Sequence, residues 1–390
     1  MFIHLKLQHI FGTSPVNFIE TNGKQVAVLS PTHKITWQWI KLLISSGFLA
    51  VLWLQIILSR GKEKLITTLE SMLYSTGILA FVILKLIYLR RRYFVVELLN
   101  NVVGFEKSLK IGGNQTQYFP PQAIAKVLIQ FVQYCFIVAT PVLMVTYGLQ
   151  RWINPCTSAL FLYNLIPECV YEKSSPWVNS SLIQLAIQIL VSLYLMVDMC
   201  GGFIFQVIEM MYLQSCCFKH YIKCLLISLL RCKFKVSHLL RFRQLQIILR
   251  RYNLIQQDVM IVALLNMVLL IFVVSLYALI YLGSGDEGIS IPQLMFFSCS
   301  LLDTFLAIVV CFGAFAGVHK ESLRTVAFMR ETLLPSLKHN QSHQRRLATR
   351  YVMSFRVLKV NIGEVNYVEK FTPIVMLNFC FGQIVNLLLL

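Results

Sequence analysis

Long runs of apolar residues, separated by polar stretches that are rich in Lys and Arg, divide the chain. A membrane hydrocarbon core of about 30 Å requires about 20 apolar residues in helical conformation. The runs of sufficient length are Ile35–Ser59, Ser71–Leu89, Ala123–Leu149, Leu182–Phe205, Asp258–Leu282, Ile291–Val318 and Phe371–Leu390. The pattern predicts an all-α, polytopic membrane protein with seven transmembrane helices. We expect a short N-terminal segment, residues 1–34, followed by one seven-span domain, residues 35–390.

The distribution of basic residues predicts the orientation of the spans. The N-terminal segment and the second, fourth and sixth loops contain 27 of the 35 Lys and Arg residues, and the opposite side contains 5. The positive-inside rule therefore places the N-terminus in the cytoplasm and the C-terminus outside the cell. A net charge of +18 also occurs in nucleic-acid-binding proteins, but here the charges lie between apolar runs, as topology requires. We expect the membrane lipid as a partner and no nucleic acid.

The third loop, which this topology places outside the cell, contains three residues that are open to modification. Cys156 and Cys169 are candidates for a disulfide bond, and the alternative is a pair of free thiols. Asn179 begins an Asn-Ser-Ser sequon and is a candidate for glycosylation.

Two long cytoplasmic connections, about residues 206–257 and 319–370, place apolar residues among basic ones at helical spacing. Leu347, Tyr351, Phe355 and Leu358 repeat in this way. The pattern predicts amphipathic helices that extend the spans into the cytoplasm. They either pack against one another, which we favour, or lie on the anionic inner leaflet.

Motifs of catalysis and of cofactor binding are missing from the sequence. It contains no Gly-rich phosphate loop, no Cys-x-x-Cys pair, no His-Glu-x-x-His run and no Gly-x-Ser-x-Gly elbow. The eight His residues are scattered. We therefore expect no catalytic residues, no metal site and no cofactor, and the chain is not predicted to be an enzyme.

Charged residues inside predicted spans are costly and are therefore candidates for function. Asp303 lies near the middle of the sixth span, Asp198 in the fourth and Lys85 in the second. One interpretation is a buried structural pair of Lys85 with an Asp, or a snorkelling lysine. The other is that Asp303 faces a water-filled vestibule and binds a polar or cationic group of a ligand.

Aromatic and polar residues gather in the outer halves of the second to sixth spans, as in a small-molecule pocket of a helical bundle. With Asp303, the candidate pocket residues are Tyr74, Tyr147, Gln188, Tyr194, Tyr277 and Phe297. Taken singly, each is also typical of a packed core or of an interfacial aromatic belt.

The seventh span has a polar stripe, in which Thr372, Phe379, Gln383, Asn386 and Leu390 fall within about 60° of arc. Because amides facing lipid would cost free energy, this face must meet protein or water. The stripe either lines a pore that several subunits build together or forms hydrogen bonds between helices of one subunit.

The C-terminal 140 residues resemble the insect gustatory receptor family, which is part of the seven-span insect chemoreceptor superfamily. The similar stretches are Arg251-Tyr252-Asn253-Leu254, then residues 264–268, and the segment from Arg345 through Asn361-Ile362-Gly363-Glu364. The last span departs from the family's closing signature of Thr-Tyr, five apolar residues and Gln-Phe.

The resemblance implies a homo- or hetero-tetrameric, non-selective cation channel of the plasma membrane, opened by a small-molecule tastant. It implies that four copies of the last span line the pore, with Phe379, Gln383, Asn386 and Leu390 as candidates, and that each subunit has a pocket in its outer half. Two alternatives are a G-protein-coupled-type receptor, which requires the opposite orientation, and a membrane transporter, which would show internal repeats.

Overall fold

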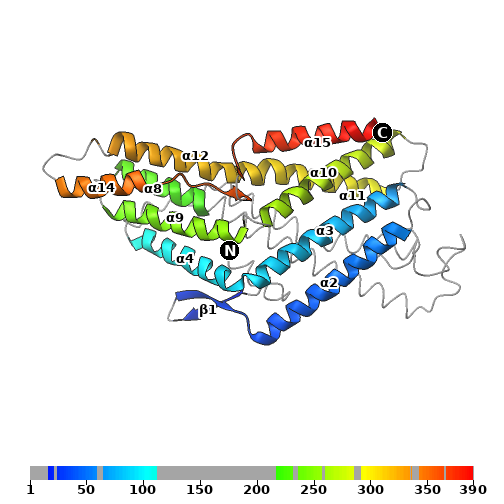
Figure 1. The fold of residues 1–390 in the computed structure, drawn as a ribbon, viewed down its shortest axis with the longest axis horizontal. Helices are drawn as coiled ribbons and strands as arrows, with labels where there is room; N and C mark the ends of the chain where they lie inside the picture. Colours follow the sequence, from blue (N-terminus) through cyan, green and yellow to red (C-terminus); the bar gives the residue numbers. More distant parts are fainter. Residues whose placement is uncertain are drawn as a thin grey trace, which may run out of the picture.

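The computed structural model describes residues 16–21, 24–58, 65–111, 217–231, 236–256, 260–284, 291–333, 335, 342–363 and 366–389. These residues form an elongated bundle of helices, most of which run roughly along its long axis (Figure 1). The third and fourth predicted spans, Ala123–Leu149 and Leu182–Phe205, lie outside the described residues.

One end of the molecule contains the apolar helices. These are α2 (Thr32–Leu58), α3 (Leu65–Arg90), α10 (Met260–Ser284), α11 (Ile291–Leu306) and α15 (Thr372–Leu388). Three of them, α2, α3 and α10, are long and apolar enough to cross a membrane, and α11 and α15 contain shorter apolar stretches. Helices are thus confirmed at all five predicted spans that the structure describes, and the fold is that of a multi-pass helical membrane protein.

The opposite end contains five helices that we call the basic bundle: α4 (Arg92–Ile111), α8 (Lys219–Arg231), α9 (Val236–Gln256), α12 (Gly313–Phe328) and α14 (Ser342–Ser354). A π-helical stretch, η6 (Ala307–Phe312), joins α11 to α12, and a second, η7 (Met329–Leu333), follows α12. Buried side chains from all five helices, such as Leu99, Leu225, Phe242, Phe315 and Val352, belong to one apolar core. The helices predicted within residues 206–257 and 319–370 are confirmed, and they pack against one another and against α4, which was not predicted.

The helix predicted through Leu358 ends earlier, at Ser354, so that part of the prediction is wrong. Phe355 and Leu358 are buried, at 1% and 5% exposure, but they lie in an extended segment. Hydrogen bonds from outside the helix replace the helical ones there: Arg330 donates to the Phe355 carbonyl at 3.0 Å, and the Leu358 N–H donates to Ser322 Oγ at 2.7 Å.

This extended segment, residues 355–361, which we call the strap, connects the basic bundle to the last helix. It leads into a short antiparallel hairpin of β3 (Asn361–Ile362) and β4 (Asn366–Tyr367). Gly363 makes the turn with a φ of 61°, a backbone conformation that glycine adopts without strain. The chain then enters α15.

The N-terminal segment forms a hairpin that the sequence analysis did not predict, β1 (Val16–Thr21) and β2 (Lys24–Leu29). It lies against α4 (Figure 1). The Asn100 side chain holds it there: its Oδ1 accepts the Ala27 N–H at 2.8 Å, and its Nδ2 donates to the Ala27 carbonyl at 3.0 Å. Asn100 therefore supplies backbone-like bonds to the outer edge of the second strand.

Candidate functional site

An apolar and aromatic cluster lies where α3, α10 and α11 meet, within the apolar end of the molecule. Phe297 of α11 is fully buried, and Tyr277 of α10 packs beside it. Tyr74 of α3 stacks on Phe296 with ring centroids 5.0 Å apart, and Phe296 meets Phe297 edge to face at 5.5 Å. The structure thus brings three of the predicted pocket residues, Tyr74, Tyr277 and Phe297, to one place.

A buried hydroxyl group that the sequence analysis missed lies on the same face of α10. At about 100° per residue, Ser275 lies about 20° from Leu282 and about 40° from Leu279 around α10, and these two residues belong to the cluster or pack against it. It is 0% exposed, and its Oγ forms no hydrogen bond with the part of the chain that the structure describes. The signal in the sequence was a lone hydroxyl in a helix of apolar residues.

The structure separates Asp303 from this cluster. Asp303 follows Phe297 by six residues, which rotates it about 120° around α11, and it is exposed. Lys85 is instead buried, at 2% exposure, with its Nζ 4.9 Å from the centroid of the Phe81 ring. Among the described residues no ion pair joins Lys85 to Asp303, so the structural pair considered for these two is not formed.

Several predicted positions lie outside the described residues. These are the pocket candidates Tyr147, Gln188 and Tyr194, the disulfide candidates Cys156 and Cys169, the glycosylation candidate Asn179, the charged Asp198 and the pore candidate Leu390.

The last helix, α15, is buried on only one side. Met376, Cys380 and Ile384, four residues apart, face the core that α10 and α12 share with it. The side chains that point away from this row are exposed, among them the polar Asn378 and the apolar Val385 and Leu389, at 54% and 80% exposure. Most of the surface of α15 thus has no covering within the described part of this chain.

The predicted pore stripe lies at the border between these two faces. Phe379 is 52% exposed, and Asn386 is exposed. Gln383 is half-buried, because it lies about 60° from the centre of the buried row whereas Asn386 lies about 120° away. Their role in a pore stays a prediction.

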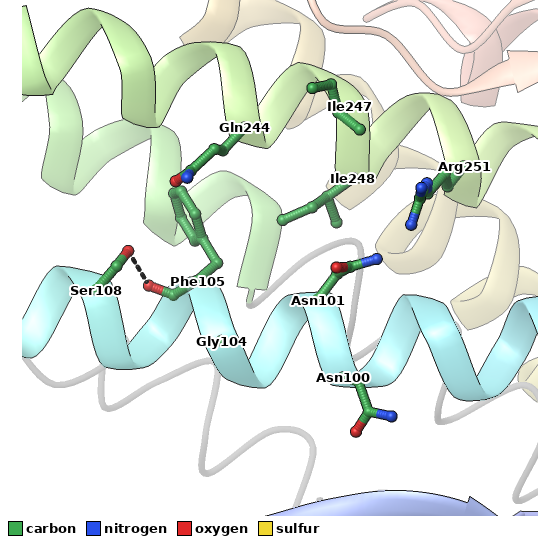
Figure 2. A pocket seen from close by; sticks show the side chains of 9 residues that line it. All are labelled: Asn100, Asn101, Gly104, Phe105, Ser108, Gln244, Ile247, Ile248 and Arg251. Carbon is green, nitrogen blue, oxygen red and sulfur yellow. Dashed lines mark hydrogen bonds between the residues drawn. The ribbon is translucent and has the colours of Figure 1, made fainter.

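A cavity of about 280 Å³ lies in the basic bundle between α4 and α9. Figure 2 shows Asn101 pointing into it from α4, while the neighbouring Asn100 points the opposite way, toward the N-terminal hairpin. Arg251 lines the cavity from α9 and forms an ion pair with Glu97, which neutralises its charge. This cavity is small, and its one described charge is already paired.

Buried polar groups join α4 to α8 in the same bundle. The Tyr221 hydroxyl donates to Glu106 Oε1 at 2.6 Å, and burial, with the Glu106 carboxylate beside it, raises the pKa of Tyr221. Burial lowers the pKa of the neighbouring His220, since the charged imidazolium is poorly solvated there, and Lys223 adds to this effect while Glu106 opposes it. These groups are structural: no cluster of three potential metal ligands occurs among the residues that the structure describes.

Comparisons with known proteins identify the fold. No family model matches the chain, and no curated protein matches it. The class of fold is nevertheless defined: the structure is similar to solved structures of an insect olfactory receptor.

That receptor is the insect olfactory receptor OR5 from Machilis hrabei. The similarity covers 99% of this chain and 97% of the receptor chain, with a TM-score of 0.71 and 11% sequence identity. A second structure of the same receptor, in complex with eugenol, gives a TM-score of 0.59 and 14% identity over the same shares of both chains. Both are structures of a receptor.

Proposed function

We propose that this chain is a subunit of a ligand-gated, non-selective cation channel of the gustatory type, opened by a small-molecule tastant. The observation that carries the proposal is the exposed surface of α15. The helix is apolar enough to lie in a membrane, yet it presents Asn378 and Asn386 away from its own subunit. Amides that face lipid are costly, so neighbouring copies or water must cover this surface.

A ring of four subunits around α15 would satisfy this surface. Each helix would keep its buried row, with Met376 and Ile384, against its own α10 and α12, and would turn its polar positions toward the axis. Gln383 and Asn386 would then replace part of a cation's water shell, and Phe379 or Leu390 would supply the hydrophobic constriction. The assembly is a homo- or hetero-tetramer.

The ligand we propose is a small, largely apolar molecule with one hydrogen-bonding group. The cluster at Phe297 and Tyr74 supplies the aromatic walls, and a ligand oxygen would satisfy the Ser275 hydroxyl, whose burial without a partner costs about 1–3 kcal/mol. The solved receptor of the same fold was obtained with eugenol, an aromatic molecule. The remaining candidates for this pocket are Tyr147, Gln188, Tyr194 and Tyr277, whereas Asp303, which lies apart from the cluster, would contact a ligand only from outside it.

We place the chain in the plasma membrane with its N-terminus in the cytoplasm and its C-terminus outside, on the strength of the basic loops. In this orientation Cys156 and Cys169 would close a disulfide, which stabilises by up to about 3 kcal/mol through loop closure, and Asn179 would be glycosylated. Tags at each end of intact cells test the orientation, and only the C-terminal tag is expected to be accessible without permeabilisation.

The decisive experiment combines imaging and electrophysiology on the full chain. Purified particles should show four-fold symmetry with α15 at the axis, and expressing cells should pass cation current on application of aromatic tastants. Gln383→Ala and Asn386→Ala should change the relative permeability of sodium, potassium and a large organic cation more than they change agonist potency. Thr349→Ala, in α14 of the basic bundle, is the control. Monomeric particles, or permeability ratios that no substitution in α15 alters, would refute the proposal.

A further inference from the structure

A groove of about 730 Å³ runs between α9 and the strap, on the side of α9 away from Arg251. Its lining comes from two segments far apart in the sequence, residues 243–254 of α9 and residues 354–361 at the end of α14 and in the strap. It is separate from the aromatic cluster and from α15, and the proposed channel function makes no use of it.

Hydrogen bonds hold the two walls of the groove in place. Gln246 Nε2 donates to the Arg356 carbonyl at 2.8 Å, and Asn253 Nδ2 donates to the Lys359 carbonyl at 2.9 Å. The Leu358 N–H, as described above, is bound by Ser322 of α12. Because these hydrogen bonds fix the strap before a ligand arrives, the free energy of binding would not be reduced by the entropic cost of ordering the strap.

The charge in the groove is positive and unbalanced. Arg243, Arg250 and Arg356 line it with exposed guanidinium groups, and none of them forms an ion pair with the residues in view. Lys359 also lines it, with its Nζ 4.1 Å from the centroid of the Tyr367 ring. The three arginines are therefore the cationic groups most open to an anion.

The lining also limits the kind of anion. The described residues that line it include no acidic and no aromatic side chain, so this part of the lining repels cations and offers no ring on which a nucleobase could stack. Guanidinium groups bind phosphate oxygens in a bidentate manner. Several such groups around one groove fit a compact anion with several phosphates better than a single carboxylate.

We propose that this groove is a binding site for a polyphosphorylated polyol, with Arg243, Arg250 and Arg356 as its phosphate ligands. Two sources offer this chemistry, a soluble inositol phosphate and the headgroup of a phosphoinositide lipid. The groove lies near the start of an apolar helix, where a lipid headgroup or a soluble phosphate could reach it. The helix α9 ends at Gln256 and the apolar α10 begins at Met260, and Arg250 is about 9 Å along the helix axis from the end of α9.

The test measures binding of inositol hexakisphosphate to the purified, assembled full-length protein in detergent at 150 mM salt, by titration calorimetry. R250Q/R356Q removes two of the three arginines, and both side chains are exposed, so the fold should persist; the matched control R346Q/R350Q removes two exposed arginines of α14 outside the groove. Each lost contact weakens binding about fivefold even at the dielectric constant of water, so we expect a loss of roughly 25-fold in R250Q/R356Q and little change in the control.

A competition arm then separates the two sources. The protein is placed in nanodiscs with and without phosphatidylinositol 4,5-bisphosphate, and inositol hexakisphosphate is titrated again. Displacement by the lipid assigns the groove to a membrane headgroup, and undiminished binding assigns it to a soluble polyphosphate. Absence of binding in wild-type protein, or an equal loss in R250Q/R356Q and in the control, would overturn the proposal. Neither result bears on whether the chain conducts ions.

Discussion

Asn253 makes two of the hydrogen bonds by which α9 holds the strap, and its replacement by Ala should loosen the connection to α15. The side chain is 9% exposed and makes two contacts with the strap. Its Nδ2 donates to the Lys359 carbonyl at 2.9 Å, and its Oδ1 accepts the Asn361 N–H at 3.4 Å. A net hydrogen bond contributes about 0.5–1.5 kcal/mol, and a buried group left without a partner costs about 1–3 kcal/mol. The longer of the two bonds is the weaker, so we expect a total of about 2 kcal/mol.

Hydrogen exchange at the Asn361 amide measures this loss directly. A local destabilisation of about 2 kcal/mol should speed exchange about 30-fold if exchange proceeds by local opening. Gln246→Ala is the matched control, since Gln246 makes only one bond to the strap, at an exposed position, and should speed exchange less than about fivefold. If Asn253→Ala leaves the Asn361 amide as protected as in wild type, or no less protected than Gln246→Ala does, the strap is held by other contacts and the reasoning is wrong.

Three further predictions concern other parts of the molecule. Asn100→Ala should release the N-terminal hairpin to proteolysis by removing two hydrogen bonds, together about 2 kcal/mol, whereas Asn101→Ala, whose Nδ2 has no partner among the described residues, should not. Burial lowers the pKa of His220 from 6.5, so the folded protein binds this proton less tightly than the unfolded chain does. The resulting stabilisation is complete above pH 6.5 and is lost as the pH falls toward the lowered pKa. The melting temperature should therefore fall between pH 7.5 and pH 5.5, and His220→Gln should flatten this dependence. Tyr74→Leu should raise the half-maximal tastant concentration severalfold by removing the stacking on Phe296, an interaction of about 0.5–1.5 kcal/mol, without changing ion permeability; an unchanged dose response would exclude Tyr74 from the pocket.

The helices were predictable from the sequence because their signals are local. A membrane span requires about 20 apolar residues in succession, and the run that became α10 contains no charged residue from Met260 to Ser284. The helices of the basic bundle repeat apolar residues every three or four positions, which buries one stripe whatever the partner. Both signals can be recognised in the sequence without any knowledge of the tertiary structure.

The strap and the N-terminal hairpin were missed because their partners are distant. Phe355 and Leu358 repeat at helical spacing, but spacing alone cannot show that Arg330 and Ser322 take the backbone groups that a helix would use. The hairpin is a two-stranded sheet, which is only marginally stable alone, and it depends on Asn100, more than 70 positions later in the chain.

The candidate site was predicted in part, for a related reason. Aromatic residues in the outer halves of spans are informative as a group, and Tyr74, Tyr277 and Phe297 did come together. The side of a helix on which a lone polar residue lies is harder to predict from sequence, because a shift of one position along the helix changes the direction of the side chain by about 100°. Asp303 lies on another side of α11 from the cluster and is exposed, so its contact with a ligand stays a prediction, while Ser275, a lone hydroxyl in an apolar run, is buried.

The strap also explains how two distant parts of the molecule can influence each other. It is bonded to α9 through Asn253 and to α12 through Ser322, and it leads through the short hairpin directly into α15. A displacement of α9 relative to α12 cannot leave the strap unchanged, because one segment of backbone is tied to both helices. Among the described residues α15 also packs on α10, η6 and α12, and the strap adds a direct backbone connection from the basic bundle to the start of α15. An anion bound between α9 and the strap would therefore act on the same connection that positions the proposed pore helix.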